Sequence, residues 1–396
     1  MNGQLLRIPG ADGLRALACL LVVGHHTTQR FNPETSAAWI QNIHFFGMRG
    51  EVGVSLFFVL SGCLLSLPFW HSFLNSDRIP SLKLYAINRA ARVFPAYWLN
   101  LLVCTLTALW VFDQNINWWR LISGLLFINS YHYSSFFPAE LNGPLWSIGL
   151  EVWCYLLLPL VLFTILKTTK KISFAILGMI TWIVALQLLN PLIVNNFMTD
   201  DKLKGWQYGL TGGAKQWLPY WNIGSFFTQF LCGSLAALVI IALRSRGTSK
   251  SRAFDVSFIV FAIAAIWLVG IRLVPGAPDS FTKQPYVAPF YAILMAGVLV
   301  SATFSRHICK LLDNKLFKWI AKLSFSIYLW HMFLIVMIER KFLENYVYYG
   351  LTDSAQWVFI SAIVLMTSIL IAATSWRFLE SPMLKYARTT TQEANK

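Results

Sequence analysis

The sequence predicts an all-α fold, a polytopic membrane bundle of helices, from its composition and its apolar stretches. Of the 396 residues, 57% are hydrophobic and 12% are charged, and the mean hydropathy is +0.57. Such values are typical of chains whose solvent is a bilayer. Stretches of about 20 mostly apolar residues, long enough to cross the hydrocarbon, recur along the chain. About ten transmembrane helices are expected, at 8–29, 53–73, 96–112, 148–166, 172–189, 223–243, 256–271, 287–304, 317–338 and 355–375.

Charges in the connecting segments predict how these helices are oriented. One alternating set of segments carries eighteen Lys and Arg residues and the other carries ten. Basic residues accumulate on the cytoplasmic side, so both termini are expected there, in a multi-pass protein of the cytoplasmic (inner) membrane. The net charge of +15 then reflects topology, and no nucleic-acid partner is expected. The richer set is 74–95, 167–171, 244–252, 306–318 and the tail; the poorer set is 30–52, 113–147, 196–222, 272–286 and 339–354.

The chain is expected to form one membrane domain, residues 1–380, followed by a cytoplasmic tail, 381–396, that is disordered at its end. The first apolar stretch carries ionisable residues and lacks a small-residue cleavage site, so it is expected to remain as a helix. The outer segment 113–147 is expected to contain a helix at the membrane interface that could form a lid. The residues that predict it are Trp118, Trp119 and the mostly apolar run 121–128. The six cysteines lie in spans or in a cytoplasmic segment, so no disulfide framework is expected.

Arg15 and His26 are the most informative residues of the first apolar stretch. They are eleven positions apart. On a helix this spacing brings both side chains to one face, separated along the axis by roughly 16 Å, while His25 falls about 80° away. An ionisable group at membrane depth usually faces a protein interior or a wet cavity. The pair therefore indicates a polar path through the bundle.

Two further titratable residues are expected at the depth of His26. Glu151 lies about one turn below the outer surface, and His331 lies roughly 21 Å above the cytoplasmic face. With Ser324 and Tyr328, His331 forms a polar stripe at helical spacing. A carboxylate in the hydrocarbon needs a partner or a proton, and the two histidines are the natural candidates for Glu151. A purely structural polar contact is the alternative for His331.

Arginines gather at the inner level. Arg15 is expected near the cytoplasmic face, and Arg89 and Arg92 lie three positions apart just before the third predicted helix. Guanidinium groups are preferred ligands of phosphate, so the cluster indicates a phosphate site. The alternatives are that Arg89 and Arg92 only mark topology and that Arg15 reaches the headgroups beside Asp12. No pair of histidines has the close spacing of a zinc motif, and no metal is expected.

Six segments of the chain carry motifs, at 12–26, 53–62, 89–95, 146–159, 324–331 and 377–382. In the same order along the chain, these motifs resemble those of the acyltransferase-3 family of integral membrane acyltransferases. That family O-acylates surface polysaccharides and some small molecules. One such motif would be weak evidence, but six in order are specific. Ser55, Cys63 and Val152 depart from the residues common in the family.

The resemblance implies a donor, an acceptor and a set of site residues. The donor would be cytoplasmic acyl-CoA, first of all acetyl-CoA, and the acceptor a hydroxyl of a surface glycan or lipid-linked glycan, such as O-antigen or exopolysaccharide. Transfer would be direct or would pass through an acyl-histidine intermediate. Membrane lipids surround the protein, and its oligomeric state is left open. The expected catalytic residues are His26, Glu151 and His331; the donor-binding residues are Arg15, Arg89 and Arg92; the acceptor-binding residues are Asn142, Trp146, Ser147 and Tyr328.

Other functions remain open at this point. A secondary transporter of a sugar, lipid or proton would also use buried Arg, Glu and His, although the sequence shows no repeated halves and no paired broken spans. A non-catalytic membrane subunit would leave Glu151 and the histidines without a purpose. Within the family, a macrolide-like small molecule is another acceptor class. Some relatives carry a fused extracytoplasmic hydrolase-like domain, and this chain is expected to act alone or with a separate partner.

Overall fold

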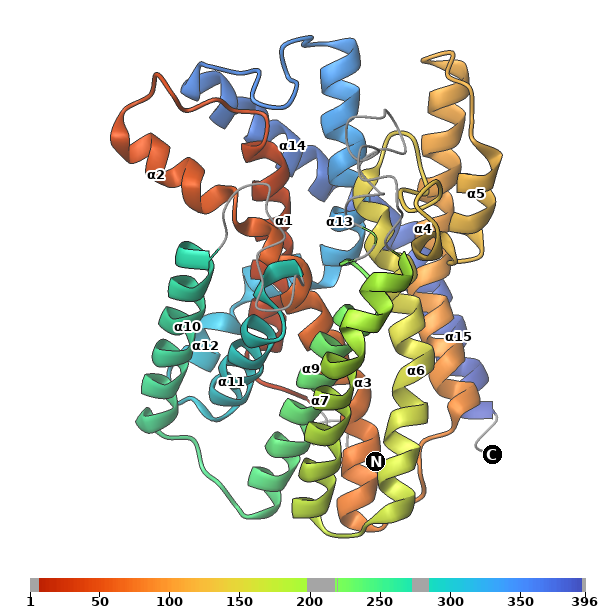
Figure 1. Cartoon of the computed structure of the whole chain (residues 1–396), viewed down its shortest axis with the longest axis vertical. Helices are drawn as coiled ribbons and strands as arrows, with labels where there is room; N and C mark the ends of the chain where they lie inside the picture. Colours follow the sequence, from red (N-terminus) through yellow and green to blue (C-terminus); the bar gives the residue numbers. More distant parts are fainter. Residues whose placement is uncertain (1–6, 198–217, 219, 273–284, 394–396) are drawn as a thin grey trace.

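The computed structural model describes residues 7–197, 218, 220–272 and 285–393. Its regular structure is helical throughout the described part (Figure 1), which confirms the all-α class. The longer helices are α1 (Ala11–Thr28), α2 (Ala38–Gly47), α3 (Gly53–Asn75), α4 (Leu82–Trp110), α5 (Trp118–Leu125), α6 (Trp146–Thr168), α7 (Ile172–Phe197), α9 (Ile223–Ser245), α10 (Arg252–Arg272), α11 (Phe290–Phe304), α13 (Lys315–Lys341), α14 (Ser354–Ser375) and α15 (Ser381–Glu393). Short helical pieces are η1 (Gly50–Val52), η2 (Asn129–Tyr131), η3 (Gly143–Leu145), η4 (Pro285–Val287), α12 (Ile308–Leu312) and η5 (Trp376–Glu380).

Each of the ten predicted apolar stretches corresponds to a helix. In the described part of the chain, eight segments are long and apolar enough to cross a bilayer, as expected for a polytopic bundle. Helix α1, which carries the polar residues singled out above, and α11, which has only 15 residues, are not among the eight. The total of ten spans and the cytoplasmic position of both termini stay predictions.

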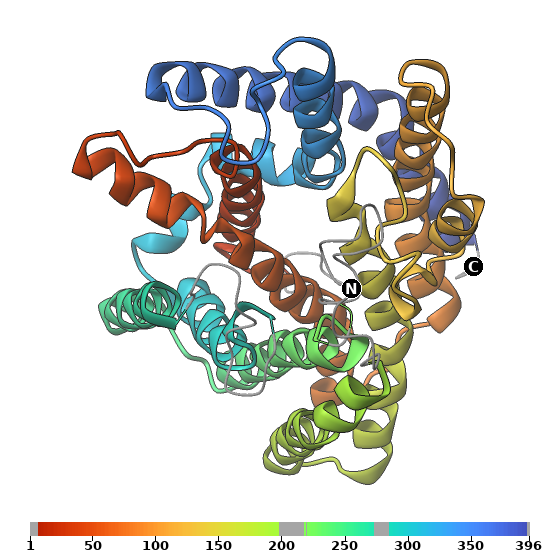
Figure 2. The ribbon, with the colours of Figure 1, turned by 45° about the horizontal axis from the view of Figure 1, so that its top comes forward.

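The helices form two groups that α1 and α3 connect. Helices α3, α6, α7 and α9 pack together, and α1, α2, α13 and α14 pack together. Figure 1 shows the first group in its lower half and the second in its upper half, and the tilted view in Figure 2 keeps them apart in the same way. Contact between α1 and α3 joins the groups. Polar residues of α1 therefore lie at the junction.

The crossing of α3 and α9 depends on two glycines. A Cβ on Gly62 would lie 1.9 Å from the carbonyl oxygen of Phe230, and one on Gly233 would lie 1.9 Å from the carbonyl oxygen of Val59. Small residues allow membrane helices to approach until their backbones touch. The close crossing leaves little freedom for Ser61, the neighbour of Gly62 in α3.

Helix α4 begins well before the apolar stretch that predicted it. The Ser81 hydroxyl accepts a hydrogen bond from the Leu84 amide and caps the helix, which starts at Leu82. Arg89 and Arg92 therefore lie inside α4, and the prediction that placed them in a connecting segment was wrong. Hydropathy detects contact with lipid rather than helicity, so it misses a first section of helix that contains Lys83, Asn88, Arg89 and Arg92.

The outer segment contains the predicted helix, α5. Trp118 and Trp119 lie on its surface, 59% and 48% exposed, as suits an interfacial position. The Asn117 side chain caps its start. Arg120 is buried and forms an ion pair with Glu140, which ties the helix to the following loop. Burial lowers the pKa of Arg120 and the Glu140 carboxylate opposes that shift. A lid role for α5 stays a prediction.

Most of the predicted tail is a helix in the described part of the chain, and disorder at its end stays a prediction. Helix α15 continues to Glu393, and residues 394–396 lie outside the described part. The helix packs against α4, a contact that hydropathy does not report. Before it, the chain forms a π-helical turn, η5, that places Glu380 in the interior with 1% of its surface exposed. Such turns occur frequently at functional sites.

Candidate functional site

Two of the predicted site histidines meet in the interior. His26 comes from α1 and His331 from α13, and their ring centroids are 5.2 Å apart. Contact between these two helices brings the rings together, as their expected depths predicted. His331 is fully buried and His26 is partly exposed. The layer therefore contains a pair of imidazoles, one of which is accessible.

The tautomer of His331 follows from its hydrogen bond. Its Nδ1 lies 2.7 Å from the carbonyl oxygen of Tyr328. A carbonyl only accepts, so Nδ1 must carry the hydrogen and Nε2 of the neutral ring has a lone pair. This Nε2 is buried and has no hydrogen-bond partner within the described structure. A buried polar atom without a partner is costly, which marks it as a candidate contact for a substrate.

A chain of hydrogen bonds determines the tautomer of His26 as well. His25 Nδ1 lies 2.7 Å from the carbonyl oxygen of Met48 and must donate to it. Neutral His25 therefore presents a lone pair on Nε2, and the Gln29 amide group donates to it at 3.0 Å. The Gln29 carbonyl oxygen consequently faces His26 Nδ1, also at 3.0 Å, and accepts its hydrogen. Each step follows from the one before, starting at a group that cannot donate.

The result is an imidazole oriented as a general base. With the hydrogen on Nδ1, His26 carries its lone pair on Nε2, which faces away from Gln29. A positioned imidazole whose second nitrogen is fixed by a hydrogen bond is the arrangement that enzymes use to remove a proton from a hydroxyl. At the other end of this series of hydrogen bonds, a carboxylate oxygen of Glu51 lies 3.9 Å from His25 Nε2.

Glu151 lies elsewhere than predicted. Its carboxylate accepts a hydrogen bond of 2.8 Å from the Ser61 hydroxyl of α3, and it is an electrostatic neighbour of Arg15. No hydrogen bond or ion pair in the described part joins it to His26 or His331. The expectation of a histidine partner was therefore wrong. The inward side of α6 at this turn faces α3, and the serine supplies the polar partner that the carboxylate needs.

The three predicted arginines are neighbours but differ in their partners. Arg92 is an electrostatic neighbour of both Arg15 and Arg89. Its guanidinium pairs with Glu380 at 3.3 Å, and the Ser326 hydroxyl also donates to that carboxylate. Arg15 and Arg89 have no hydrogen bond or ion pair within the described residues. Two guanidinium groups are therefore free to bind an anion, while the third is held by a buried carboxylate.

The predicted acceptor residues line the layer beside His331. The hydroxyls of Tyr328 and Ser147 lie 2.6 Å apart, and Tyr328 also donates to a backbone carbonyl at 2.9 Å. Asn142 donates to the Leu329 carbonyl at 2.7 Å, which leaves its buried Oδ1 without a partner in the described structure. Trp146 instead packs in an aromatic cluster, parallel to the ring of Phe136.

Several contributing residues were not singled out from the sequence. Gln29 follows the two histidines by three and four positions, the spacing at which helical side chains meet, so its role was detectable in principle. Ser61 and Glu380 lie in the matched motifs, but their partners are 90 and 288 positions away in the sequence. Asn100 donates to the Leu329 carbonyl of α13 and accepts a hydrogen bond from Asn142. No sequence motif pointed to Asn100.

Every cysteine of the chain lies within the described residues. All six cysteines are free and buried. Across the described ranges, no group of three His, Cys, Asp or Glu side chains is arranged to hold a metal ion.

Comparisons of the sequence with known proteins identify the family. A model of an acyltransferase domain matches residues 8–375. A protein of Staphylococcus aureus (strain COL) named "Putative O-acetyltransferase" is 24% identical over 396 residues, which cover 96% of this chain and 57% of the relative. O-acetyltransferase OatA of strain NCTC 8325 / PS 47 is 25% identical over 399 residues, with the same coverage. This chain thus spans about 57% of the length of these relatives.

No solved structure matches the chain. The family assignment depends on the sequence match, which extends from before α1 to the end of α14. All the site residues named above except Glu380 fall within it. The chain therefore belongs to the acyltransferase-3 family of membrane acyltransferases.

Proposed function

We propose that the protein is a membrane-embedded O-acyltransferase. It moves an acyl group, acetyl in the first instance, from cytoplasmic acyl-CoA to a hydroxyl of a surface glycan. The observation that carries this proposal is the partly exposed His26, whose Nε2 lone pair is set by the hydrogen bonds through Gln29 and His25. The names of the Staphylococcus aureus relatives, both O-acetyltransferases, support the acetyl group.

The proposed reaction is direct transfer with His26 as general base. The acceptor hydroxyl gives its proton to Nε2 while its oxygen attacks the thioester carbonyl carbon. The tetrahedral oxyanion then collapses, the carbon–sulfur bond breaks, and the proton passes from His26 to the leaving sulfur. The products are an ester and free CoA thiol. As His26 gains its positive charge, Gln29 Oε1 accepts a stronger, charge-assisted hydrogen bond from Nδ1.

The arginine cluster is proposed to bind phosphate groups of the donor. Arg15 and Arg89 supply guanidinium groups without other partners, which suits bidentate contacts to phosphate. Arg92 acts mainly through its ion pair with Glu380, which positions α4 against the π-helical turn. Glu151 lies within electrostatic range of Arg15 and orients that side chain. It is therefore a positioning residue in this proposal rather than a partner of the histidines.

The acceptor is proposed to lie against Tyr328, Ser147 and Asn142. Hydroxyl and amide groups of this kind bind sugar hydroxyls, and the unpartnered Oδ1 of Asn142 is an acceptor for one of them. The buried Nε2 of His331 accepts a hydrogen bond from a second hydroxyl of the sugar, which leaves the hydrogen of the reacting hydroxyl for His26 Nε2. The surface glycan as acceptor and the inner membrane as location are parts of this proposal.

Labelled acetyl-CoA incubated with the purified full chain and a hydroxyl acceptor tests the proposal. Wild type is expected to release CoA thiol and form a labelled ester. His26→Ala should lower the rate by about 10²–10⁴-fold, the range for loss of a general base. His132→Ala, at an exposed histidine of the outer segment, is the matched control and should retain the rate.

Two outcomes would contradict the proposal. Intact acetyl-CoA beside normal binding and flux of an exported sugar would identify a transporter instead. Double-displacement kinetics, with acetyl retained on the protein in the absence of acceptor, would replace direct transfer by a covalent intermediate.

A further inference from the structure

An open cavity of about 620 Å³ lies beside the beginning of α1, away from the histidine layer. Its lining comes from segments that the charge pattern assigns to the cytoplasmic side. Five of its eight lining residues are basic. They are Arg7, Arg244, Lys250, Lys310 and Lys318.

The positive charge of this cavity is not balanced by carboxylates. Among the described lining residues Asp313 is the one acidic side chain, and it already pairs with Arg7 at 3.3 Å and accepts from the Gly10 amide at 3.0 Å. The side-chain ammonium groups of Lys310 and Lys318 have no hydrogen bond or ion pair within the described residues. The cavity therefore has unused cationic groups and room for an anion.

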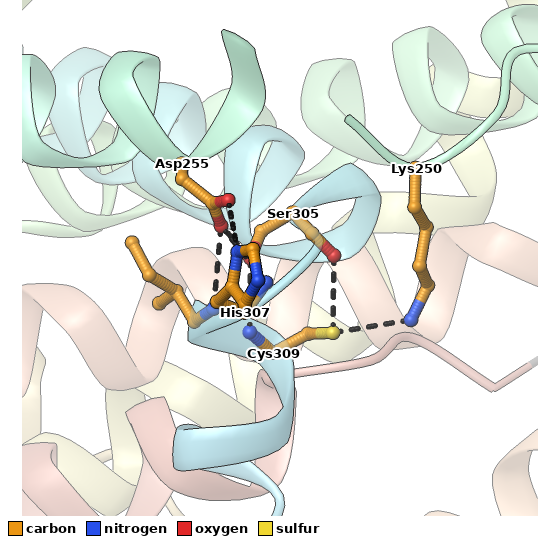
Figure 3. Close-up of polar contacts among 6 residues, drawn as sticks. Lys250, Asp255, Ser305, His307 and Cys309 are labelled. Carbon is orange, nitrogen blue, oxygen red and sulfur yellow. Dashed lines mark hydrogen bonds and ion pairs between the residues drawn. The ribbon is translucent and has the colours of Figure 1, made fainter. Parts of the chain in front are cut away.

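One wall of the cavity is held in place by polar contacts at the start of α12. Figure 3 shows Asp255 of α10 accepting a hydrogen bond from the Ser305 hydroxyl at 2.7 Å and pairing with His307 at 3.0 Å. The Cys309 thiol donates to the Ser305 carbonyl at 3.1 Å, and the Lys250 ammonium lies 3.1 Å from the same sulfur. A cation positioned by such contacts loses less freedom when it binds a ligand.

Basic residues that only mark the cytoplasmic side of the membrane would not be expected to gather around one cavity. Basic residues that only mark the cytoplasmic side are spread over the surface, as Arg306 and Lys315 are, outside the cavity lining. Here cations from the N-terminal segment, the end of α9, the α9–α10 connection, α12 and the start of α13 surround one space. Cavities of about 300–1,000 Å³ are of the size that holds small-molecule ligands.

We propose that this cavity binds a phosphorylated ligand, the nucleotide portion of the acyl donor. The choice of a nucleotide rests on the proposed function, whereas the binding of phosphate rests only on the cavity and its charge. The ammonium groups of Lys310 and Lys318, which have no carboxylate partner within the described residues, suit phosphate oxygens. An anionic phospholipid headgroup offers the same chemistry, and the experiment below distinguishes the two sources.

Binding of adenosine 3′,5′-bisphosphate to the purified full chain, measured by calorimetry in neutral detergent, tests the inference. The cavity variant is Lys310→Gln with Lys318→Gln, which removes two charges that hold no other group. The control is Arg306→Gln with Lys315→Gln, which makes the same charge change in the same segment outside the cavity. The cavity variant is expected to bind about tenfold more weakly and the control within about twofold of wild type.

A lipid arm identifies the source of the phosphate. In phosphatidylcholine nanodiscs, the melting temperature is measured with and without added phosphatidylglycerol. If the nucleotide does not bind, but phosphatidylglycerol stabilises wild type and the control and not the cavity variant, the ligand is a headgroup and the phosphate site stands. If neither probe distinguishes the cavity variant from the control, the inference is overturned.

The outcomes also separate this inference from the proposed function. Nucleotide binding that is lost in the cavity variant, in a protein that never transfers acetyl, supports the cavity and contradicts the transferase. Acetyl transfer in which the cavity variant retains both the donor KM and the nucleotide affinity of wild type supports the transferase and overturns the cavity.

Discussion

Replacing Gln29 by methionine is expected to slow acyl transfer without weakening substrate binding. The side chain keeps a similar length but loses the carbonyl oxygen that accepts from His26 Nδ1 at 3.0 Å and the amide that donates to His25 Nε2 at 3.0 Å. Without these contacts, His26 populates the other tautomer, in which Nε2 carries the hydrogen and cannot accept a proton. The imidazolium that forms during the reaction also loses its acceptor.

The magnitude follows from the hydrogen bond that is lost. A hydrogen bond to a charged group contributes about 1.5–3 kcal/mol, and about 1.36 kcal/mol corresponds to a tenfold change in rate. Both side chains are partly exposed, so the lower part of this range applies. The expected loss in kcat is about 10- to 30-fold, with KM for the donor within about twofold because Gln29 contacts histidines rather than the arginine cluster.

The assay is steady-state transfer from labelled acetyl-CoA, with monodispersity and melting temperature recorded for each variant. Gln29→Glu retains an oxygen facing His26 Nδ1 and should recover most of the rate. Gln41→Met is the matched control, because the Gln41 side chain in α2 donates only to the backbone carbonyl of Ser36, just before the helix. The reasoning fails if folded Gln29→Met retains kcat within about twofold of wild type, or if Gln29→Glu is no better than Gln29→Met.

Three further predictions concern the supports of the site. Gly62→Ala should lower the melting temperature by several degrees or prevent folding, because its methyl would meet a backbone carbonyl at 1.9 Å, whereas Gly270→Ala, with open space around it, should not. Arg92→Ala should destabilise the fold by about 3 kcal/mol, because it leaves the buried Glu380 carboxylate without its ion-pair partner. Arg89→Ala should mainly raise the KM for the donor. Equal melting temperatures of the two variants would contradict these different roles. Ser61→Ala should reduce kcat/KM about fivefold, because it removes the hydrogen bond to the Glu151 carboxylate. Ser61→Thr, which keeps a hydroxyl, should restore kcat/KM. An unchanged kcat/KM in the alanine variant would show that Ser61 does not support Glu151.

The local sequence was sufficient to predict features that depend on a single helix or a single motif. Apolar stretches identified a helix in each of ten places because the cost of an unpaired backbone in lipid leaves few alternatives. The spacing of Arg15 and His26 placed both on one face of α1, and depth along two helices brought His26 to His331. These inferences need only helix geometry.

Partners that are far apart in the sequence were the part that local reasoning missed. Glu151 was assigned to the histidines by depth alone, but the rotation of α6 against α3 pairs it with Ser61. Hydropathy predicts how deep a residue lies in the membrane. It does not predict the direction around the helix axis in which the side chain points, and this direction decides which helix it meets. Arg92 similarly appeared free until the π-helical turn placed Glu380 beside it.

By itself, the sequence determined the helical membrane class, the family and the residues from which a site is built, because lipid solvation and motif order act on short stretches of chain. Only the tertiary structure decided which nitrogen of His26 is available, which arginines remain unpaired and where a cationic cavity forms. The physical reason is that a hydrogen bond depends on angles and on atoms within about 3 Å, and packing between helices sets both.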